Sequence, residues 1–273
     1  FFLTKFKVGD AVYYAGNVSK LGSYSEFTAV DSRIAALKPK SLSFLDAASI
    51  PLVALTTVES IGDAIVCQKG KSILIFNGAG GVGSFAIQYA KLMGLSVISS
   101  ASRPDTIAFV KELGADYVVN HREPIEPQLK SQNLSGYDYL FCLADNSALP
   151  ELLKFLNVGG IANTVGAISP EIASKIDWVT MFSKSQALRF EFMFARSLFG
   201  CELEKQGEIL AKVAEFYDQG KLKTVVQKVF PISEVSNAHS LQESNTVTGK
   251  LVLDLSEFLE CVISFVVWKI GKT

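Results

Sequence analysis

The sequence predicts an α/β fold organised around a doubly wound parallel sheet, and three features of the chain point to it. Residues 73–76 are an apolar run with β-branched side chains, typical of a parallel strand that is buried on both faces. A cluster of glycines and then a helical pattern follow this run directly. Strand-like and helix-like segments alternate from there through residue 165, which is the pattern of successive strand–helix–strand units.

The glycine cluster has the spacing G-x-G-x-x-G, in Gly78, Gly80 and Gly83. Gly78 can supply a tight turn, Gly80 lets the backbone approach a phosphate, and Gly83 lets the helix pack close to the strand. Because the N–H groups at a helix N-terminus favour an anion, this position predicts a binding site for the pyrophosphate of a dinucleotide. The alternative is a glycine-rich loop that binds no ligand.

Upstream of the glycines, residues 8–14 are expected to run from a turn into a strand, and residues 22–30 alternate like a second strand. Ser43 and Asp46 have the spacing of a capping box, which predicts that a helix begins there. Pro51 separates this helix from a second helical segment.

Downstream of the glycines, the pattern continues in strands and helices. The predicted strands are residues 95–100, 117–119, 139–143 and 160–165, and the predicted helices are 85–93, 104–113 and 149–156. Right-handed crossovers would place the ligand at the carboxyl ends of these strands. Beyond residue 194 the pattern changes to helices at 202–218 and 233–243 and strand-like runs at 223–229 and 250–255.

Composition excludes several classes of partner. The 273 residues carry 26 Lys and Arg against 27 Asp and Glu, a formal net charge of −1, so we expect no nucleic-acid partner. No apolar run reaches the ~20 residues that span a bilayer, and no signal-peptide pattern is present, so we expect no membrane partner. Cys67, Cys142, Cys201 and Cys261 are far apart in the sequence, which favours free thiols and a cytoplasmic location.

Segments spread along the chain resemble the medium-chain dehydrogenase/reductase superfamily, on its quinone-oxidoreductase side and closest to the zinc-type alcohol dehydrogenase-like branch. The matching segments are residues 8–12, 22–27, 47–52, 78–83, 111–116, 192–196 and 249–253. They occur in the order of the family and together cover roughly residues 6–255. The glycine motif alone is shared by many families, whereas the ordered set is far more specific.

The resemblance implies a Rossmann nucleotide-binding domain inserted into a GroES-like β domain. Residues 1–54 would be the C-terminal remainder of the GroES-like substrate domain, 55–194 the Rossmann domain, and 195–255 the segment that returns to complete the substrate domain. The opening strands of the family are expected to be missing, as in an N-terminally truncated fragment or an incomplete gene model. Residues 256–273 form a tail without an assigned role, either a read-through product or a packed strand.

The cofactor is predicted from the residues that follow the second strand of the motif. Sites that prefer NAD usually carry an Asp or Glu about 20 residues beyond the glycines, where it binds the ribose 2′-hydroxyl. Here residues 99–103 read Ser-Ser-Ala-Ser-Arg, without an acid. Serine hydroxyls and a guanidinium suit a 2′-phosphate, so we predict NADP(H), with Ser102 and Arg103 as the phosphate contacts. The alternative is that Arg103 is a solvated loop residue.

The remaining cofactor contacts are implied by the resemblance or by position beyond a strand. They are Thr56 and Thr57 near the nicotinamide, Asn120 and His121 near the adenosine, Gly81 and Val82 in the glycine turn, and Ala144 and Val165 where the cofactor would cross later strands. Ordinary loop or core packing is the alternative for each.

The name of the branch suggests zinc, but the visible sequence does not support it. A catalytic zinc needs about three ligands from Cys, His or carboxylate groups. Zinc-dependent relatives place one Cys just before the threonine that corresponds to Thr57, and residues 51–56 contain no such ligand. The four-cysteine structural lobe of those relatives is absent as well, and we predict no bound metal.

The resemblance implies an NADPH-dependent oxidoreductase that transfers a hydride to a small molecule, either a quinone or an α,β-unsaturated carbonyl. Tyr13 and Tyr14 carry phenol groups that could act as the acid, although packing in a strand explains them equally well. No catalytic acid is therefore assigned. The alternatives are a zinc-dependent alcohol dehydrogenase and a non-catalytic NADP-binding protein or inactive truncated product.

Residues 187–194 predict an edge strand of the sheet and a homodimer formed through it. Leu188, Phe190, Phe192 and Phe194 would share one face of this strand. An edge strand with so many apolar side chains favours pairing with a second copy. The alternative is that these phenylalanines pack inside one subunit against the helix predicted at residues 202–218.

Overall fold

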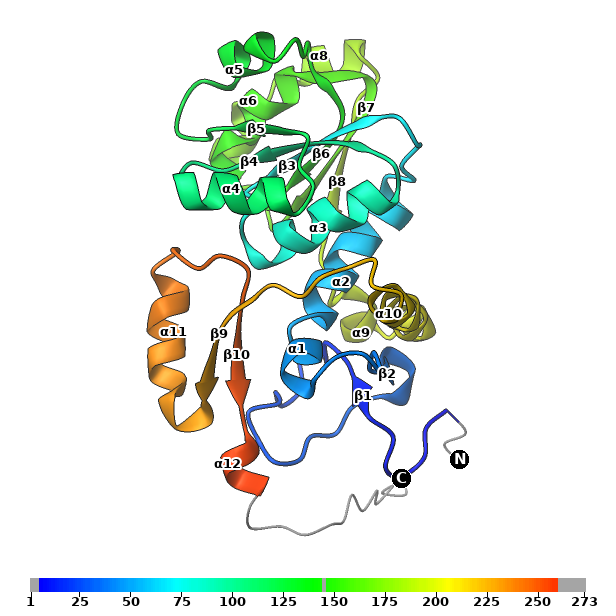
Figure 1. Ribbon diagram of the computed structural model, residues 1–273. Coiled ribbons are helices and arrows are strands. Elements are labelled where there is room, and N and C mark those ends of the chain that lie inside the picture. The colour runs from blue at the N-terminus through cyan, green and yellow to red at the C-terminus, as the bar shows by residue number, and fades with distance from the viewer. Residues whose placement is uncertain (1–4, 144–145, 260–273) are drawn as a thin grey trace.

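The computed structural model describes residues 5–143 and 146–259, which form two lobes (Figure 1). The upper lobe contains a six-stranded sheet, and the lower lobe contains two small sheets of two strands each. The first and last parts of the described chain contribute to the lower lobe, whereas its middle forms the upper one. Within the described ranges, no helix combines the length and the apolar character needed to cross a bilayer.

Six parallel strands form the main sheet in the order β5-β4-β3-β6-β7-β8. Their bounds are β3 Ser72–Phe76, β4 Ser96–Ser100, β5 Tyr117–Val119, β6 Tyr137–Cys142, β7 Leu156–Val165 and β8 Ala187–Glu191. The chain therefore starts at the centre of the sheet and winds outward in both directions, which is the order of doubly wound dinucleotide-binding sheets. The predicted α/β fold is confirmed, and the winding reverses between β3 and β6.

The central strand β3 is buried on both faces because its side chains alternate between two apolar clusters. Ile73 and Ile75 pack with side chains of the helix that follows the glycines. Leu74 belongs to the cluster on the opposite face. All three side chains are 0% exposed, and burial of a side chain of this size contributes about 1.5–3 kcal/mol. The strand that precedes the glycine turn is therefore fixed in place by apolar packing on both of its faces.

Helices cover both faces of the sheet, with α3 and α4 on one and α5, α6 and α8 on the other. Their bounds are α3 Gly81–Leu92, α4 Pro104–Glu112, α5 Ile125–Ser131, α6 Leu149–Lys154, α7 Pro170–Ser174 and α8 Trp178–Ser183. The predicted helices at 85–93, 104–113 and 149–156 correspond to α3, α4 and α6, with ends that differ by up to a few residues, as helix ends commonly do.

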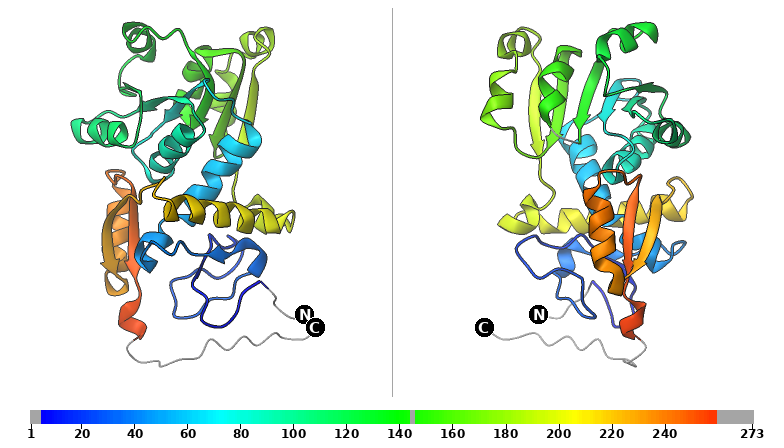
Figure 2. Two further views of the ribbon diagram at one scale, coloured as in Figure 1. Left: turned by 45° about the vertical axis from the view of Figure 1, so that its right-hand side comes forward. Right: turned by 90° about the vertical axis from the view of Figure 1, so that its left-hand side faces the viewer.

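Two helical stretches connect the lobes. The helix α2 (Pro51–Thr57) continues directly into a π-helical segment, Val58–Ala64, and together they run from the lower lobe to the upper one (Figure 2). The helix α10 (Leu203–Asp218) lies across the junction and follows the short helix α9 (Ala195–Phe199).

The lower lobe is built from short elements. Their bounds are β1 Val12–Tyr13, β2 Ala36–Leu37, α1 Phe44–Ala48, β9 Val226–Pro231, α11 Val235–Glu243, β10 Lys250–Asp254 and α12 Ser256–Leu259. The strands β1 and β2 pair antiparallel, and β9 and β10 pair parallel. The predicted helix start at Ser43 is confirmed, because its hydroxyl accepts a hydrogen bond from the Asp46 N–H at 3.0 Å. Residues 260–273, where a packed strand was one expectation, lie outside the described residues.

The strand predicted at residues 22–30 is wrong. This segment contains no strand, and its alternating side chains remain largely exposed, including Tyr24 at 61% and Phe27 at 60%. Alternation produces a strand only where a neighbouring strand satisfies the backbone groups, and none of the described strands lies against it.

The strand β8 lies at the edge of the sheet, as expected, but ends at Glu191 rather than at residue 194. Phe190 is 62% exposed and Phe192 is 52% exposed, so these two side chains do not pack inside the subunit. Phe194 is partly buried against the cluster that contains Leu210 of α10, so the alternative holds for this residue alone. Glu191 and Met193, on the other face, are the buried side chains.

Candidate nucleotide-binding site

The carboxyl ends of the parallel strands bring several of the predicted cofactor residues to one edge of the sheet. Gly78 follows β3, Ser102 follows β4 and His121 follows β5, while Val165 is the last residue of β7. Ala144 follows β6 and lies outside the described residues. This edge contains the position where the winding reverses, which is where doubly wound sheets bind their ligands.

The turn after β3 depends on Asn77 and Gly78 in different ways. Asn77 has the left-handed conformation, with φ of 68°, so it rather than Gly78 supplies the tight turn. Gly78 is required for space, because a Cβ at this position would overlap the hydroxyl of Ser99. The Gly78 N–H donates to the Ser100 carbonyl at 3.1 Å, and the Asn77 N–H donates to Ser100 Oγ at 2.7 Å. The turn is thereby tied to the end of β4.

The other two motif glycines shape the start of α3. A Cβ on Gly83 would lie 2.6 Å from Gly78 Cα, so only a glycine lets the helix pack onto the turn. Gly80 is the N-cap residue, and its Cβ position has no neighbouring atom nearer than 3.7 Å. Space is therefore open at Gly80, where a phosphate would approach.

The N-terminus of α3 has the chemistry of an anion site. No side chain caps it, and the first intrahelical bond runs from Ser84 N–H to the Gly80 carbonyl at 2.9 Å. The N–H groups of Val82 and Gly83 precede that bond and have no partner among the described backbone groups. These donors and the positive end of the helix dipole together fit the pyrophosphate of a dinucleotide.

Arg103 lies at the outer end of this site, where it is the N-cap residue of α4. Its guanidinium contacts the exposed Asp105 carboxylate at 3.3 Å and the Thr246 carbonyl at 3.4 Å. Both contacts are long, and the side chain is 35% exposed, so the guanidinium can turn toward an incoming phosphate. Ser102 is half-buried beside it.

Of the two residues predicted near the adenosine, His121 has the more suitable position. Its ring meets the Phe76 ring edge-on, with centroids 5.8 Å apart. Partial burial, then the charges of Arg122 and Arg103, lower the pKa of His121, so the ring is neutral at pH 7. The Asn120 side chain is already engaged within its own loop, where it donates to Glu123 Oε1 at 3.0 Å.

The two threonines at the end of α2 also differ in whether their side chains already have a hydrogen-bond partner. Thr56 Oγ1 donates to the Leu52 carbonyl at 2.8 Å. Thr57 is 0% exposed, and none of the described residues gives its hydroxyl a hydrogen bond. A buried hydroxyl without a partner costs free energy, so Thr57 retains hydrogen-bonding capacity for a ligand.

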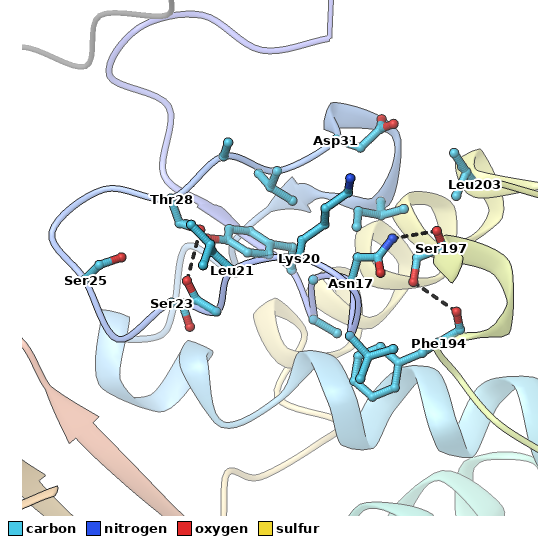
Figure 3. A pocket seen from close by; sticks show the side chains of 18 of the residues that line it. Asn17, Lys20, Leu21, Ser23, Ser25, Thr28, Asp31, Phe194, Ser197 and Leu203 are labelled. Atoms are coloured by element: carbon cyan, nitrogen blue, oxygen red, sulfur yellow. Dashed lines mark hydrogen bonds between the residues drawn. The ribbon is translucent and has the colours of Figure 1, made fainter. Parts of the chain in front are cut away.

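Sequence reasoning missed a cavity of about 1010 Å³ in the lower lobe (Figure 3). Residues 14–31 line most of it, and Phe194, Ser197 and Leu203 close the opposite side. Asn17 points across it and donates to the Ser197 carbonyl at 2.6 Å. None of the predicted cofactor residues that the structure describes lines this cavity. The only signal in the sequence was the aromatic and apolar content of residues 22–30.

The two tyrosines of the lower lobe have separate environments. The Tyr13 hydroxyl is buried and donates to the Leu210 carbonyl at 2.6 Å, so it serves packing. Tyr14 lines the cavity, and burial raises the pKa of its hydroxyl.

The donor groups do not fit a zinc ion. Across residues 5–143 and 146–259, no three side chains of His, Cys, Asp or Glu gather closely enough to hold a metal. Burial raises the pKa of Cys67 to about 12, which keeps it a thiol rather than the thiolate that zinc requires. Cys142 is buried and Cys201 is exposed.

Comparisons with known proteins agree with this geometry. The family profile described as zinc-binding dehydrogenase matches residues 113–253. A zinc-type alcohol dehydrogenase-like protein of Staphylococcus epidermidis is 36% identical over 264 residues, which cover 93% of this chain and 77% of that protein. The NADPH-dependent alkenal/one oxidoreductase of Arabidopsis thaliana chloroplasts is 31% identical, over 90% of this chain and 58% of that protein.

Solved structures show the same fold. A structure from Rhizobium etli CFN 42, described provisionally as a zinc-dependent alcohol dehydrogenase, has a TM-score of 0.84 and 33% identity. It is matched over 92% of this chain and 75% of its own. The Escherichia coli quinone oxidoreductase in complex with NADPH has a TM-score of 0.79 at 22% identity, over 91% of this chain and 76% of its own, and this likeness concerns the fold alone.

The strand order and the glycine turn, together with these relatives, define a nucleotide-dependent oxidoreductase. The chain belongs to the zinc-type alcohol dehydrogenase-like family of the medium-chain dehydrogenase/reductase superfamily.

Proposed function

We propose that this protein is an NADPH-dependent oxidoreductase that transfers a hydride to a quinone or an α,β-unsaturated carbonyl. The observation that carries the proposal is the open, uncapped N-terminus of α3 beside Arg103, with no acid among residues 99–102 at the end of β4. A carboxylate there would select the 2′-hydroxyl of NAD, whereas a guanidinium attracts a 2′-phosphate. The similarity to the Arabidopsis NADPH-dependent alkenal/one oxidoreductase supports the same choice.

In this proposal, each part of the crevice has a separate role. The N–H groups of Val82 and Gly83 bind the pyrophosphate, and Ser102 and Arg103 bind the 2′-phosphate. His121 lies beside the adenosine, and the unpartnered Thr57 hydroxyl and Val165 lie toward the nicotinamide. The bound cofactor supplies the hydride, while the protein holds the two reacting carbons in line and excludes water. No step uses zinc, because the described donor groups do not fit one.

The test is a fluorescence titration with NADPH and NADH, together with reduction assays on a quinone and on an alkenal. We expect NADPH to bind about tenfold or more tightly than NADH and to support turnover. A preference for NADH would contradict the cofactor assignment. NADPH binding without turnover would favour the non-catalytic alternative, and near-stoichiometric zinc in purified protein would favour a zinc-dependent alcohol dehydrogenase.

The organisation of the chain is proposed on the same basis. We assign residues 1–54 and 195–255 to the substrate domain and residues 55–194 to the Rossmann domain. The exposed Phe190 on β8 and Phe192 just beyond it support a homodimer formed through this edge. The free thiols of Cys67 and Cys201 support a cytoplasmic location.

A further inference from the structure

The side chain of Asn146 joins the segments that follow two neighbouring strands of the main sheet. Asn146 lies beyond the end of β6, and its Nδ2 donates to two carbonyls just beyond β7, Gly166 at 3.4 Å and Ala167 at 3.1 Å. Its Oδ1 accepts a hydrogen bond from Thr164 Oγ1, near the end of β7. The donor and the acceptor of this amide are therefore both used to hold the turn after β7.

Both sides of this contact are anchored. Asn146 is 6% exposed and begins a short 3₁₀ helix, Asn146–Ala148, that leads into α6. Leu149 and Leu152 of α6 are buried in the apolar cluster on one face of the sheet, which fixes the start of this helix. On the other side, Gly166 has a φ of 105°, a conformation that favours glycine, so the chain turns where the amide contacts it.

The contacts require a side chain that carries both a donor and an acceptor on a short stem. A carboxamide has both groups, whereas an ionised carboxylate of the same shape would place an oxygen against the carbonyls of Gly166 and Ala167. Thr164 is 0% exposed, so its hydroxyl depends on a partner inside the protein.

The contact lies on the side of the crevice away from the adenosine. Arg103 and His121 follow β4 and β5, and the glycine turn follows β3. Because the sheet order is β5-β4-β3-β6-β7-β8, a dinucleotide that crosses the crevice continues from the glycine turn toward β6 and β7. The segments that Asn146 joins would then lie beneath the nicotinamide half. Val165 stands between Thr164 and Gly166, the two residues through which the amide holds this turn.

We propose that Asn146 is a positioning residue: its amide fixes the turn after β7, so that Val165 and the adjacent backbone hold the nicotinamide ring in line with the acceptor. This inference rests on the proposed function, which supplies the cofactor and the hydride transfer. Asn146 acts through this turn and not on the ring, because its own donor and acceptor are already used. A displacement of about 1 Å can lower a rate about 100-fold, so a looser turn should slow the reaction more than it weakens cofactor binding.

The experiment compares the full chain with Asn146→Ala. The matched control is Asn157→Ala, at the opposite end of β7, where the amide donates to Asp138 Oδ1 at 3.3 Å. Binding is measured for NADPH and for adenosine 2′,5′-bisphosphate, which lacks the nicotinamide. The rate is that of NADPH oxidation in a single turnover, with the quinone or alkenal that the unaltered protein reduces, per site that binds the bisphosphate.

We expect Asn146→Ala to lower this rate about 10- to 100-fold, to weaken NADPH binding less than about tenfold and to leave bisphosphate binding unchanged. Asn157→Ala should leave all three unchanged. An unaltered rate in Asn146→Ala overturns the inference, as does a loss of bisphosphate binding in this variant, which would mean that the amide only maintains the fold.

A pH profile of Asn146→Asp separates positioning from packing. The new carboxyl group cannot donate when ionised, but once protonated it can donate to the Ala167 carbonyl again. The rate of this variant relative to the unaltered protein should therefore rise as the pH is lowered from about 8 to about 5, because burial beside carbonyls raises the pKa of a carboxyl group. The relative rate of Asn146→Ala should stay constant, and a constant relative rate for Asn146→Asp also overturns the inference. If the unaltered protein oxidises NADPH with neither acceptor, the proposed function fails first, and this inference fails with it.

Discussion

The carboxyl group of Glu191, at the end of the edge strand β8, is hydrogen-bonded to the carboxyl group of Glu59 on the π-helical segment. Both side chains are buried, at 9% and 6% exposure. Glu59 also receives Arg196 Nε at 3.2 Å and Gln206 Nε2 at 3.3 Å. In this arrangement Glu59 is a carboxylate that accepts a hydrogen bond from the protonated carboxyl group of Glu191.

This pair makes stability depend on pH. Burial, and then the charge of Glu59, raises the pKa of Glu191 to about 8 from an unfolded value of 4.5. The folded protein therefore binds the proton more tightly than the unfolded chain does. The resulting stabilisation is complete below pH 4.5 and is lost as the pH rises through about 8. We expect the free energy of unfolding to fall by about 1.4 kcal/mol per pH unit within this window.

The variant Glu191→Gln isolates this contribution, because it keeps a donor for Glu59 and cannot ionise. Denaturant unfolding between pH 5 and 9 should show a flatter profile for this variant than for the unaltered protein. Glu208→Gln, on the exposed side of α10, should reproduce the unaltered profile. Parallel profiles for Glu191→Gln and the unaltered protein would show that no proton is shared here.

Two glycines of the motif should respond oppositely to alanine. Gly78→Ala would place a methyl group against the Ser99 hydroxyl and 3.1 Å from Ile87 Cδ1, and overpacking of this kind costs about 1–3 kcal/mol. Gly80→Ala has room in the ligand-free protein, so its stability should change by less than about 1 kcal/mol. The new methyl group should nevertheless obstruct the phosphate.

Urea unfolding and NADPH titration of the two variants give the comparison. We expect Gly78→Ala to lower stability and Gly80→Ala to weaken NADPH binding at nearly unchanged stability. A Gly80→Ala variant with full NADPH affinity would mean that no phosphate approaches this part of the turn.

The strand, the glycine turn and α3 were predictable because their signals are local. The run from Ile73 to Phe76 alternates between two clusters, and the glycines follow it directly. The Glu59–Glu191 pair was not predictable, since nothing near either residue in the sequence shows that the fold brings them together. For residues 22–30 the sequence predicted a strand that does not form. Their polar and apolar residues do alternate, but a strand also needs a neighbouring strand to satisfy its backbone groups.

Arg103 should determine the choice between the two nicotinamide cofactors. Among the described residues, its guanidinium has only long contacts, to Asp105 and Thr246, so Arg103→Ala should change stability little. Loss of a charge-assisted contact to a 2′-phosphate should weaken NADPH binding about 10- to 100-fold and leave NADH binding unchanged. Arg122→Ala is the control. It removes a nearby positive charge that is not assigned to the 2′-phosphate, and so reports the effect of a general change in electrostatic potential at the site. An equal loss for NADPH and NADH in Arg103→Ala would show that this residue does not recognise the 2′-phosphate.

The edge strand β8 should pair with a second copy of the chain. Phe190 and Phe192 are exposed at 62% and 52%, and an unpaired edge with such side chains favours antiparallel association about a two-fold axis. Sedimentation at micromolar concentration should give twice the chain mass of 29.6 kDa. Phe190→Lys should shift the protein to the monomer, because it places a charge on the paired edge. Phe44→Lys, at a side chain that is 68% exposed on α1 of the lower lobe, should remain dimeric. If the unaltered protein sediments as a monomer, Phe190 and Phe192 do not form a homodimer interface.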